Sequence, residues 1–239
     1  MRLGEVLGIE VAADRSWLAI ASVLLVAFAV VFRGWLEPAP AAVATFAVTG
    51  AVLASIVMHE LAHALVARRL GMEVVGITLF VFGGIAHLRD HPSRADHAFA
   101  VALAGPLANL LVGGLLIAAP DLLSVADPLT VTILTYLGVF NAAVGLFNLL
   151  PGHPLDGGVL VRSAVWARTG DPERGRRAAR RCGLGLGVVT IAAGVSLAVA
   201  VSVPDGLYLA AVGGFLLHAA RQAARLHAEP DSDTVPAET

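Results

Sequence analysis

A histidine, a glutamate and a second histidine have the spacing of a metal site in residues 59–63, which read H-E-L-A-H. On a helix, residues i and i+4 share one face, so His59 and His63 can both reach one metal ion. Glu60 lies beside them and is suited to take a proton from water at that metal. Imidazole ligands with an open coordination position favour zinc, and we predict one zinc ion per chain.

The alternative is a pair of core histidines that hydrogen-bond to neighbouring helices. Two histidines and a glutamate inside an apolar span are costly without a function, and this favours the metal site. A catalytic zinc ion needs a third protein ligand. The candidates near membrane depth are His87, His91, His97, His153 and Asp156.

Asp156 follows a segment that interrupts a helix. Residues 148–158 read NLLPGHPLDGG, and their prolines and glycines do not continue a helix. Irregular backbone at membrane depth is tolerated mainly where it is buried in protein or lines a cavity. Asp156 is therefore a good candidate for the third ligand, whereas His153 is more typical of a loop histidine.

The composition shows what must position these residues. Of the 239 residues 57% are hydrophobic and only 14% are charged, against about 25% charged in an average soluble domain. A net charge of −2 provides no cationic surface for nucleic acid, and the apolar content excludes a disordered chain and most soluble enzymes. The charge-free runs are Trp17–Phe32, Pro38–Met58, Ala98–Pro120, Pro128–Leu155, Cys182–Pro204 and Gly206–Ala220.

A membrane-spanning helix needs about 20 mostly apolar residues, so these runs predict six transmembrane helices. Val74–Leu88, between the second and third of them, reads VVGITLFVFGGIAHL and predicts a short β-hairpin. The predicted fold is an all-α polytopic membrane protein with this hairpin added. We expect residues 1–225 to form one six-helix domain, residues 226–239 to be a disordered tail, and no cleavable signal peptide to be present.

The arginines alternate between rich and poor connections along the chain, which predicts that both termini are cytoplasmic. The richest is the fourth connection, with seven arginines between Arg162 and Arg181. An ordinary topology signal on a solvated loop explains this cluster, and a site for lipid head groups or a partner is the alternative.

Taken together, the motifs resemble the site-2 protease family of intramembrane zinc metalloproteases, in a compact form without a PDZ or CBS domain. The resemblance rests on H-E-L-A-H, on Gly83 and Gly84 in the hairpin, on A-G-P-L-A-N at residues 104–109 and on N-L-L-P-G-H-P-L-D-G-G. It implies that Asp156 is the third zinc ligand and that Asn148 assists the substrate carbonyl or oxyanion.

The resemblance also implies that residues 81–88 receive the substrate as an added strand, with Gly83, Gly84 and Ile85 at the centre of the contact. Backbone pairing of this kind holds an extended peptide. Four further residues lie within the predicted spans. Gly105 and Pro106 suggest a close helix approach or a kink, and Asn109 and Asn141 suggest either interhelical hydrogen bonds or a role in the site.

The predicted function is an intramembrane zinc endopeptidase in the cytoplasmic membrane, whose substrates are single-span, membrane-anchored regulatory proteins. Zinc held by His59, His63 and Asp156 would act with Glu60 as the base. One alternative is a transport protein with a metal or proton path, but the outer halves of the spans are almost wholly apolar. The other is a non-catalytic membrane scaffold, which would not need Glu60.

Overall fold

In this computed structural model, residues 1–80, 83–89 and 92–225 are described. They divide into two compact units, residues 1–148 and residues from 149 onwards. The predicted tail at 226–239 and part of the predicted docking segment, residues 81–82, lie outside the described residues.

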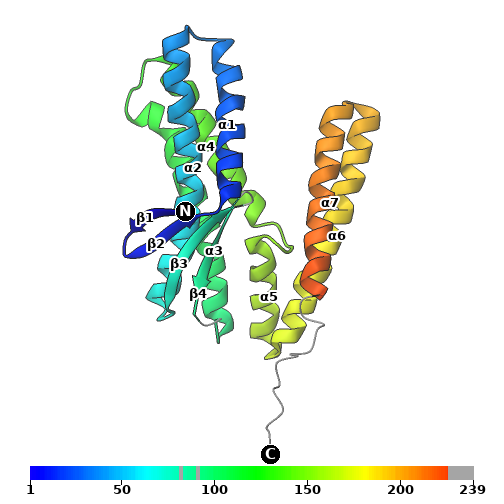
Figure 1. The fold of residues 1–239 in the computed structure, drawn as a ribbon. Helices are drawn as coiled ribbons and strands as arrows, with labels where there is room; N and C mark the ends of the chain where they lie inside the picture. The colour runs from blue at the N-terminus through cyan, green and yellow to red at the C-terminus, as the bar shows by residue number, and fades with distance from the viewer. Residues whose placement is uncertain (81–82, 90–91, 226–239) are drawn as a thin grey trace, which may run out of the picture. The chain divides into compact units, whose positions relative to one another are not determined.

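Four long helices form most of the first unit: α1 (Arg15–Arg33), α2 (Pro38–Arg69), α3 (Ala95–Leu122) and α4 (Pro128–Asn148). Helix α2 is central, since it packs against α1, α3 and α4 (Figure 1). Its 32 residues correspond to about 48 Å at 1.5 Å per residue, more than the roughly 30 Å hydrocarbon core of a bilayer. The H-E-L-A-H segment lies in its second half.

A four-stranded sheet with the order β1-β2-β3-β4 completes this unit. The predicted hairpin is present as β3 (Val74–Phe80) and β4 (Gly83–Leu88), which are antiparallel. Strands β1 (Arg2–Val6) and β2 (Ile9–Ala13) were not predicted, and β2 pairs with β3 in parallel. The sheet lies against α2 through both β3 and β4, so the hairpin is fixed beside the histidine helix (Figure 1).

The second unit contains α5 (Asp156–Thr169), α6 (Pro172–Ala200) and α7 (Val203–Arg225). The fourth predicted span ends at Asn148, before Leu155, because Pro151 and Pro154 follow. Helix α5 was not predicted. Helices α6 and α7 approach closely at small residues, since a Cβ on Gly194 would lie 2.4 Å from the backbone nitrogen of Ala210.

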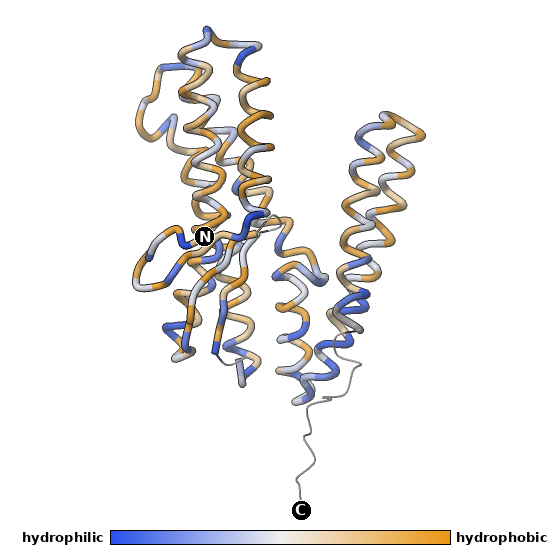
Figure 2. Tube along the Cα trace, viewed as in Figure 1, coloured by the Kyte–Doolittle hydropathy of each residue, from blue (hydrophilic) through white to orange (hydrophobic). Residues whose placement is uncertain are grey.

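Within the described residues, six helices are long and apolar enough to cross a membrane: α1, α2, α3, α4, α6 and α7. Many of their large apolar side chains are exposed, including Val23, Val26 and Val30 along α1. Figure 2 shows hydrophobic residues predominating along α1 and α2. Apolar side chains exposed along whole helices are typical of lipid contact, and the chain is a multi-pass membrane protein.

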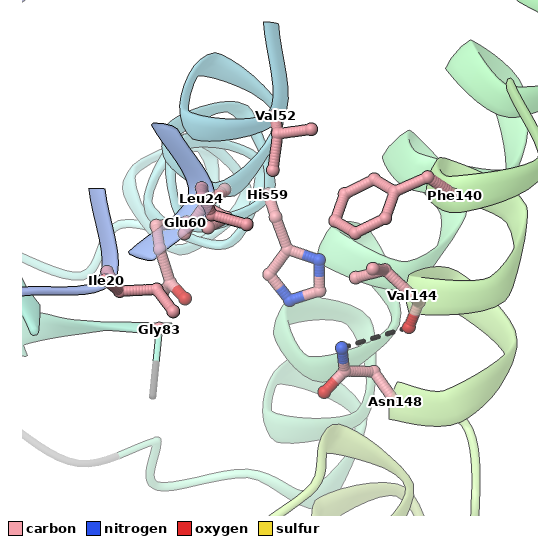
Figure 3. A pocket seen from close by; sticks show the side chains of 10 residues that line it. Ile20, Leu24, Val52, His59, Glu60, Gly83, Phe140, Val144 and Asn148 are labelled. Atoms are coloured by element: carbon pink, nitrogen blue, oxygen red, sulfur yellow. Dashed lines mark hydrogen bonds between the residues drawn. The ribbon is translucent and has the colours of Figure 1, made fainter. Parts of the chain in front are cut away.

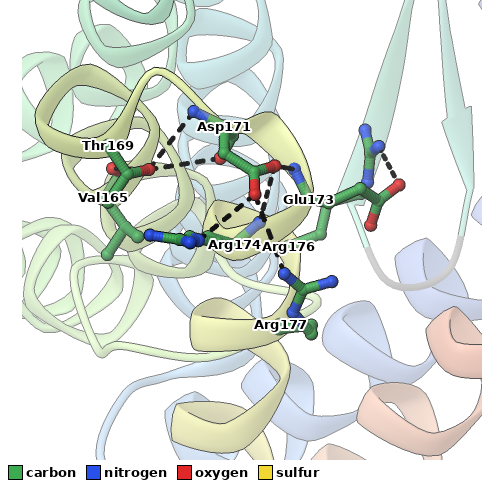
Figure 4. Close-up of polar contacts among 7 residues, drawn as sticks. All are labelled: Val165, Thr169, Asp171, Glu173, Arg174, Arg176 and Arg177. Carbon is green, nitrogen blue, oxygen red and sulfur yellow. Dashed lines mark hydrogen bonds and ion pairs between the residues drawn. The ribbon is translucent and has the colours of Figure 1, made fainter.

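Local ion pairs occupy part of the arginine cluster (Figure 4). Asp171 caps α6 and pairs with Arg174 at 3.3 Å and with Arg177 at 3.8 Å, while Arg176 pairs with Glu173. Hydrogen bonds from the backbone N–H groups of Arg174 and Glu173 hold the pKa of Asp171 below its ordinary value. Such pairs are common on solvated helix ends, and the topological interpretation of this cluster stays a prediction.

Candidate metal and catalytic site

His59 and His63 point their imidazoles toward one another from adjacent turns of α2. Their rings are nearly perpendicular with centroids 4.7 Å apart, and the two Nε2 atoms are separated by 3.1 Å. Both side chains are buried. The i, i+4 spacing therefore produces the convergence of two imidazole nitrogens that the sequence predicts.

The Nδ1 atoms of both histidines have oxygen partners. His63 Nδ1 lies 2.7 Å from the carbonyl oxygen of Val101, and His59 Nδ1 contacts Oδ1 of Asn109. Because a carbonyl oxygen can only accept, each Nδ1 donates its hydrogen. In the neutral tautomers each Nε2 then carries a lone pair, which is the state in which imidazole binds a metal.

The pair fits zinc by two observations. Two nitrogens on a tetrahedral zinc ion, each at about 2.0–2.1 Å, are about 3.3 Å apart, close to the 3.1 Å between these Nε2 atoms. Two lone pairs at this distance repel one another unless a cation lies near both. The neighbouring helix leaves room, because a Cβ on Gly105 of α3 would lie only 2.4 Å from His63 Nε2 and 2.6 Å from His59 Nε2.

A buried amide network holds His59 in this orientation. Asn109 is fully buried, and its Nδ2 donates to Ser55 Oγ at 3.1 Å and to Asn141 Oδ1 at 3.0 Å. Ser55 donates to the same oxygen of Asn141. Asn141 Nδ2 donates to the carbonyl oxygen of Leu137 at 2.8 Å. These bonds leave Asn109 Oδ1 to accept from His59, so α2, α3 and α4 together set the tautomer of one metal-ligand candidate.

We expect Asn109→Ala to weaken zinc binding by about 10- to 100-fold, because loss of a partner that orients a ligand has this effect. Asn141→Ala is the matched control, since it breaks the same network but leaves the His59–Asn109 bond in place. Competition with a zinc chelator would measure both affinities. Equal losses in the two variants would show that Asn109 acts only through stability.

Glu60 and a mostly apolar pocket lie beside His59 (Figure 3). The pocket has a volume of about 340 Å³. Its lining residues are Ile20, Leu24, Val52, Ile56, His59, Glu60, Gly83, Phe140, Val144 and Asn148. The Glu60 carboxylate accepts a hydrogen bond from the backbone N–H of Gly84, with 3.1 Å between nitrogen and Oε1. A carboxylate, an imidazole and an apolar wall are thus gathered around one space.

The other predicted residues lie as follows. Asn148 ends α4 and lines the pocket, and its Nδ2 donates one hydrogen to the carbonyl oxygen of Val144 at 3.0 Å (Figure 3). Ile85 is an exposed residue of β4. Asp156 is the first residue of α5 in the second unit.

Two of the alternative ligands lie in β4 and at the start of α3. His87 Nε2 is 2.9 Å from Oγ1 of Thr78 on the neighbouring strand. His97 is in the first turn of α3, and its backbone N–H donates a hydrogen bond to the Asp96 carboxylate. His153 belongs to the second unit, and His91 lies outside the described residues.

Val101 and Gly105 are parts of the site that the sequence did not assign to it. The sequence does not identify the Val101 carbonyl as a partner of His63, because every residue carries a backbone carbonyl. Gly105 is visible as part of A-G-P-L-A-N, but the sequence predicts only a close helix approach there. The repeat of small and polar residues along one face of α3, Gly105 and Asn109 at i and i+4, is the signal that indicates a shared contact with α2.

The chain is similar in sequence to proteins named as zinc metalloproteases. Two relatives named as zinc metalloproteases are Rip3 of Mycobacterium tuberculosis, 42% identical over 72% of this chain, and sll0528 of Synechocystis, 44% identical over 73%. The chain spans 44% and 46% of the length of these relatives. Zinc metalloprotease MJ0392 of Methanocaldococcus jannaschii is 31% identical over 48% of this chain and 33% of that protein.

The fold is also that of a solved structure. The site-2 protease from Methanocaldococcus jannaschii aligns with a TM-score of 0.63 at 23% identity, over 100% of this chain and 98% of that one. The predicted fold with six membrane-spanning helices is thereby confirmed. The family model for peptidase family M50 matches residues 47–126 and 121–190, more than half of the chain. The resemblance predicted from the motifs is therefore correct, and the chain belongs to peptidase family M50.

Proposed function

We propose that this protein is an intramembrane zinc endopeptidase. The observation that carries the proposal is the pair of Nε2 atoms 3.1 Å apart on a membrane-spanning helix, with Glu60 on the same pocket. The zinc metalloprotease names of the relatives support the metal and the reaction class.

His59 and His63 would hold the zinc ion through Nε2, and Asp156 would supply the third protein ligand. A carboxylate is an ordinary oxygen ligand of zinc, and Asp156 opens α5 directly after the irregular residues 149–155. When bound, zinc acts as a Lewis acid on the scissile carbonyl and makes a coordinated water more acidic.

Glu60 takes one proton from the attacking water while the water oxygen bonds to the carbonyl carbon. The carbon–nitrogen bond then breaks, and Glu60 returns the proton to the leaving amine. Asn148 donates an Nδ2 hydrogen to the oxygen on which negative charge develops, using the hydrogen that does not bond to Val144. The products are one new carboxyl terminus and one new amino terminus.

The substrate would be the single span of a membrane-anchored regulatory protein, cut near the cytoplasmic face. The pocket beside Glu60 is lined mainly by aliphatic side chains and Phe140, which suit the apolar residues of such a span. A peptide bond inside a helix is inaccessible, so the span must unwind, and pairing with β4 near Gly83, Gly84 and Ile85 would satisfy its backbone groups. The arginine distribution supports a cytoplasmic location of both termini.

The direct test is cleavage of a purified, fluorescently labelled single-span substrate in detergent or liposomes. We expect chelator-sensitive cleavage that added zinc restores. The His59→Ala, His63→Ala double variant should lack both cleavage and zinc. Cleavage that persists in that variant would overturn the proposal, because the proposed metal site would then be unnecessary.

A further inference from the structure

The backbone of β4 already forms a hydrogen bond with Glu60, the proposed catalytic base. In the described sheet β4 is the last strand and pairs on one side only, with β3. Its other edge carries the backbone groups that an added strand would use. The backbone N–H of Gly84 donates to Glu60 Oε1 at 3.1 Å.

Strand geometry places this N–H on the outer edge of β4. In an antiparallel ladder the N–H and C=O of one residue point to the same side, and the side alternates along the strand. Gly84 points its N–H toward Glu60, so the next outward residue is Ala86, and Ile85 between them faces β3. Gly84 also touches the glutamate closely, since a Cβ there would lie 2.5 Å from Glu60 Cγ.

A substrate strand on β4 and the Glu60 carboxylate therefore require the same hydrogen. The added strand would accept from the outward N–H groups of Gly84 and Ala86, as strands do in β-augmentation. One N–H of Gly84 cannot serve both acceptors at full strength.

We propose that Glu60 is held by Gly84 in the absence of substrate, and that strand docking on β4 takes this N–H and releases the carboxylate to the attacking water. The inference rests on the proposed function, since it assigns to substrate docking the task of freeing the base. It gives a physical reason for an extended substrate: a strand paired in register with β4 brings a backbone carbonyl to the Gly84 hydrogen. The carbonyls of a helical segment accept hydrogen bonds within the helix and do not take the Gly84 hydrogen in this way.

The test compares two inactive variants of matched size, Glu60→Gln and Glu60→Met. The glutamine amide oxygen can still accept from Gly84, whereas the thioether of methionine is a weak acceptor. The probe is a fluorescein-labelled decapeptide rich in valine and threonine, titrated against each zinc-loaded variant of this chain in detergent. We expect the methionine variant to bind this peptide about 5- to 10-fold more tightly, because the hydrogen is available without competition.

Two controls keep the result specific. Glu60→Ala should also bind more tightly than Glu60→Gln, and this excludes an effect of the methionine side chain itself. Adding Ala86→Pro to Glu60→Met should weaken the peptide complex, because proline removes the next outward donor. Equal affinities of the glutamine and methionine variants, or no binding by either, would overturn the inference. Both measurements are independent of cleavage, so a failure here is distinguishable from a failure of the proposed protease activity.

Discussion

Glu60→Gln is expected to reduce cleavage of a single-span substrate by more than about 100-fold while each chain keeps its zinc. A general base of this kind contributes about 10²- to 10⁴-fold, and glutamine cannot take a proton from water at neutral pH. The fold should change little, because the glutamine oxygen can replace the acceptor that Gly84 uses. Initial rates and metal content of the same purified samples would measure both effects.

Asp156→Ala separates the two proposed roles. If Asp156 is a zinc ligand, its removal lowers zinc affinity, and cleavage returns in part when zinc is supplied in excess. Added zinc cannot restore the Glu60→Gln variant, because that variant already contains the metal. Near wild-type cleavage by Glu60→Gln would show that another group takes the proton.

Local patterns were sufficient for the six long apolar helices and for the hairpin, but not for α5. Long apolar runs indicate helices, and the β-branched residues around Ile77 indicate a strand. Both signals lie within a short window of sequence. Strand β2 was missed although Ile9, Val11 and Ala13 alternate with less buried residues, because the strand is only five residues long and contains Glu10. Its partner β3 lies more than sixty residues away in the sequence, as Val11 pairs with Ile77, and no local pattern reveals such a pairing.

The site also combines features that local sequence predicts with contacts that depend on how distant segments pack. The spacing of His59 and His63 predicts that their imidazoles converge, since it depends only on helix geometry. The partners of His59 Nδ1 and His63 Nδ1 depend on how α3 packs against α2. For Asn109 the sequence suggests either an interhelical hydrogen bond or a role in the site, and it does not decide between them. The structure supports both interpretations at once, because the interhelical bond is the one that orients His59.

The hairpin also makes a contact with the site that the sequence does not show. The resemblance implies that Gly83 and Gly84 meet the substrate, and glycine is expected wherever a backbone must be approached closely. The structure adds that Glu60 already lies against Gly84 in the described chain. A sequence does not show this contact, since β4 begins 23 residues after Glu60 and approaches it only because the sheet packs on α2.

Gly105→Ala is expected to lower zinc affinity by more than about 100-fold, a larger effect than loss of an orienting partner. The added Cβ would lie 2.4 Å from His63 Nε2, 2.6 Å from His59 Nε2 and 2.7 Å from His59 Cε1. No real Cβ contact is this short, and the imidazoles cannot simply rotate away because Val101 and Asn109 hold their Nδ1 atoms. The methyl group would therefore take space that the metal and its ligands require.

Gly114→Ala, on the same helix, provides the matched control. A Cβ at Gly114 meets nothing within 4 Å, and alanine in place of a glycine inside a helix contributes up to about 1 kcal/mol of stability. We expect this variant to retain zinc and to unfold at the wild-type temperature or above it. Zinc content, chelator competition and thermal unfolding of both variants would be compared in one detergent. A Gly105→Ala protein that keeps wild-type zinc affinity would place the metal away from the two Nε2 atoms, because no ion could share that space with the methyl group.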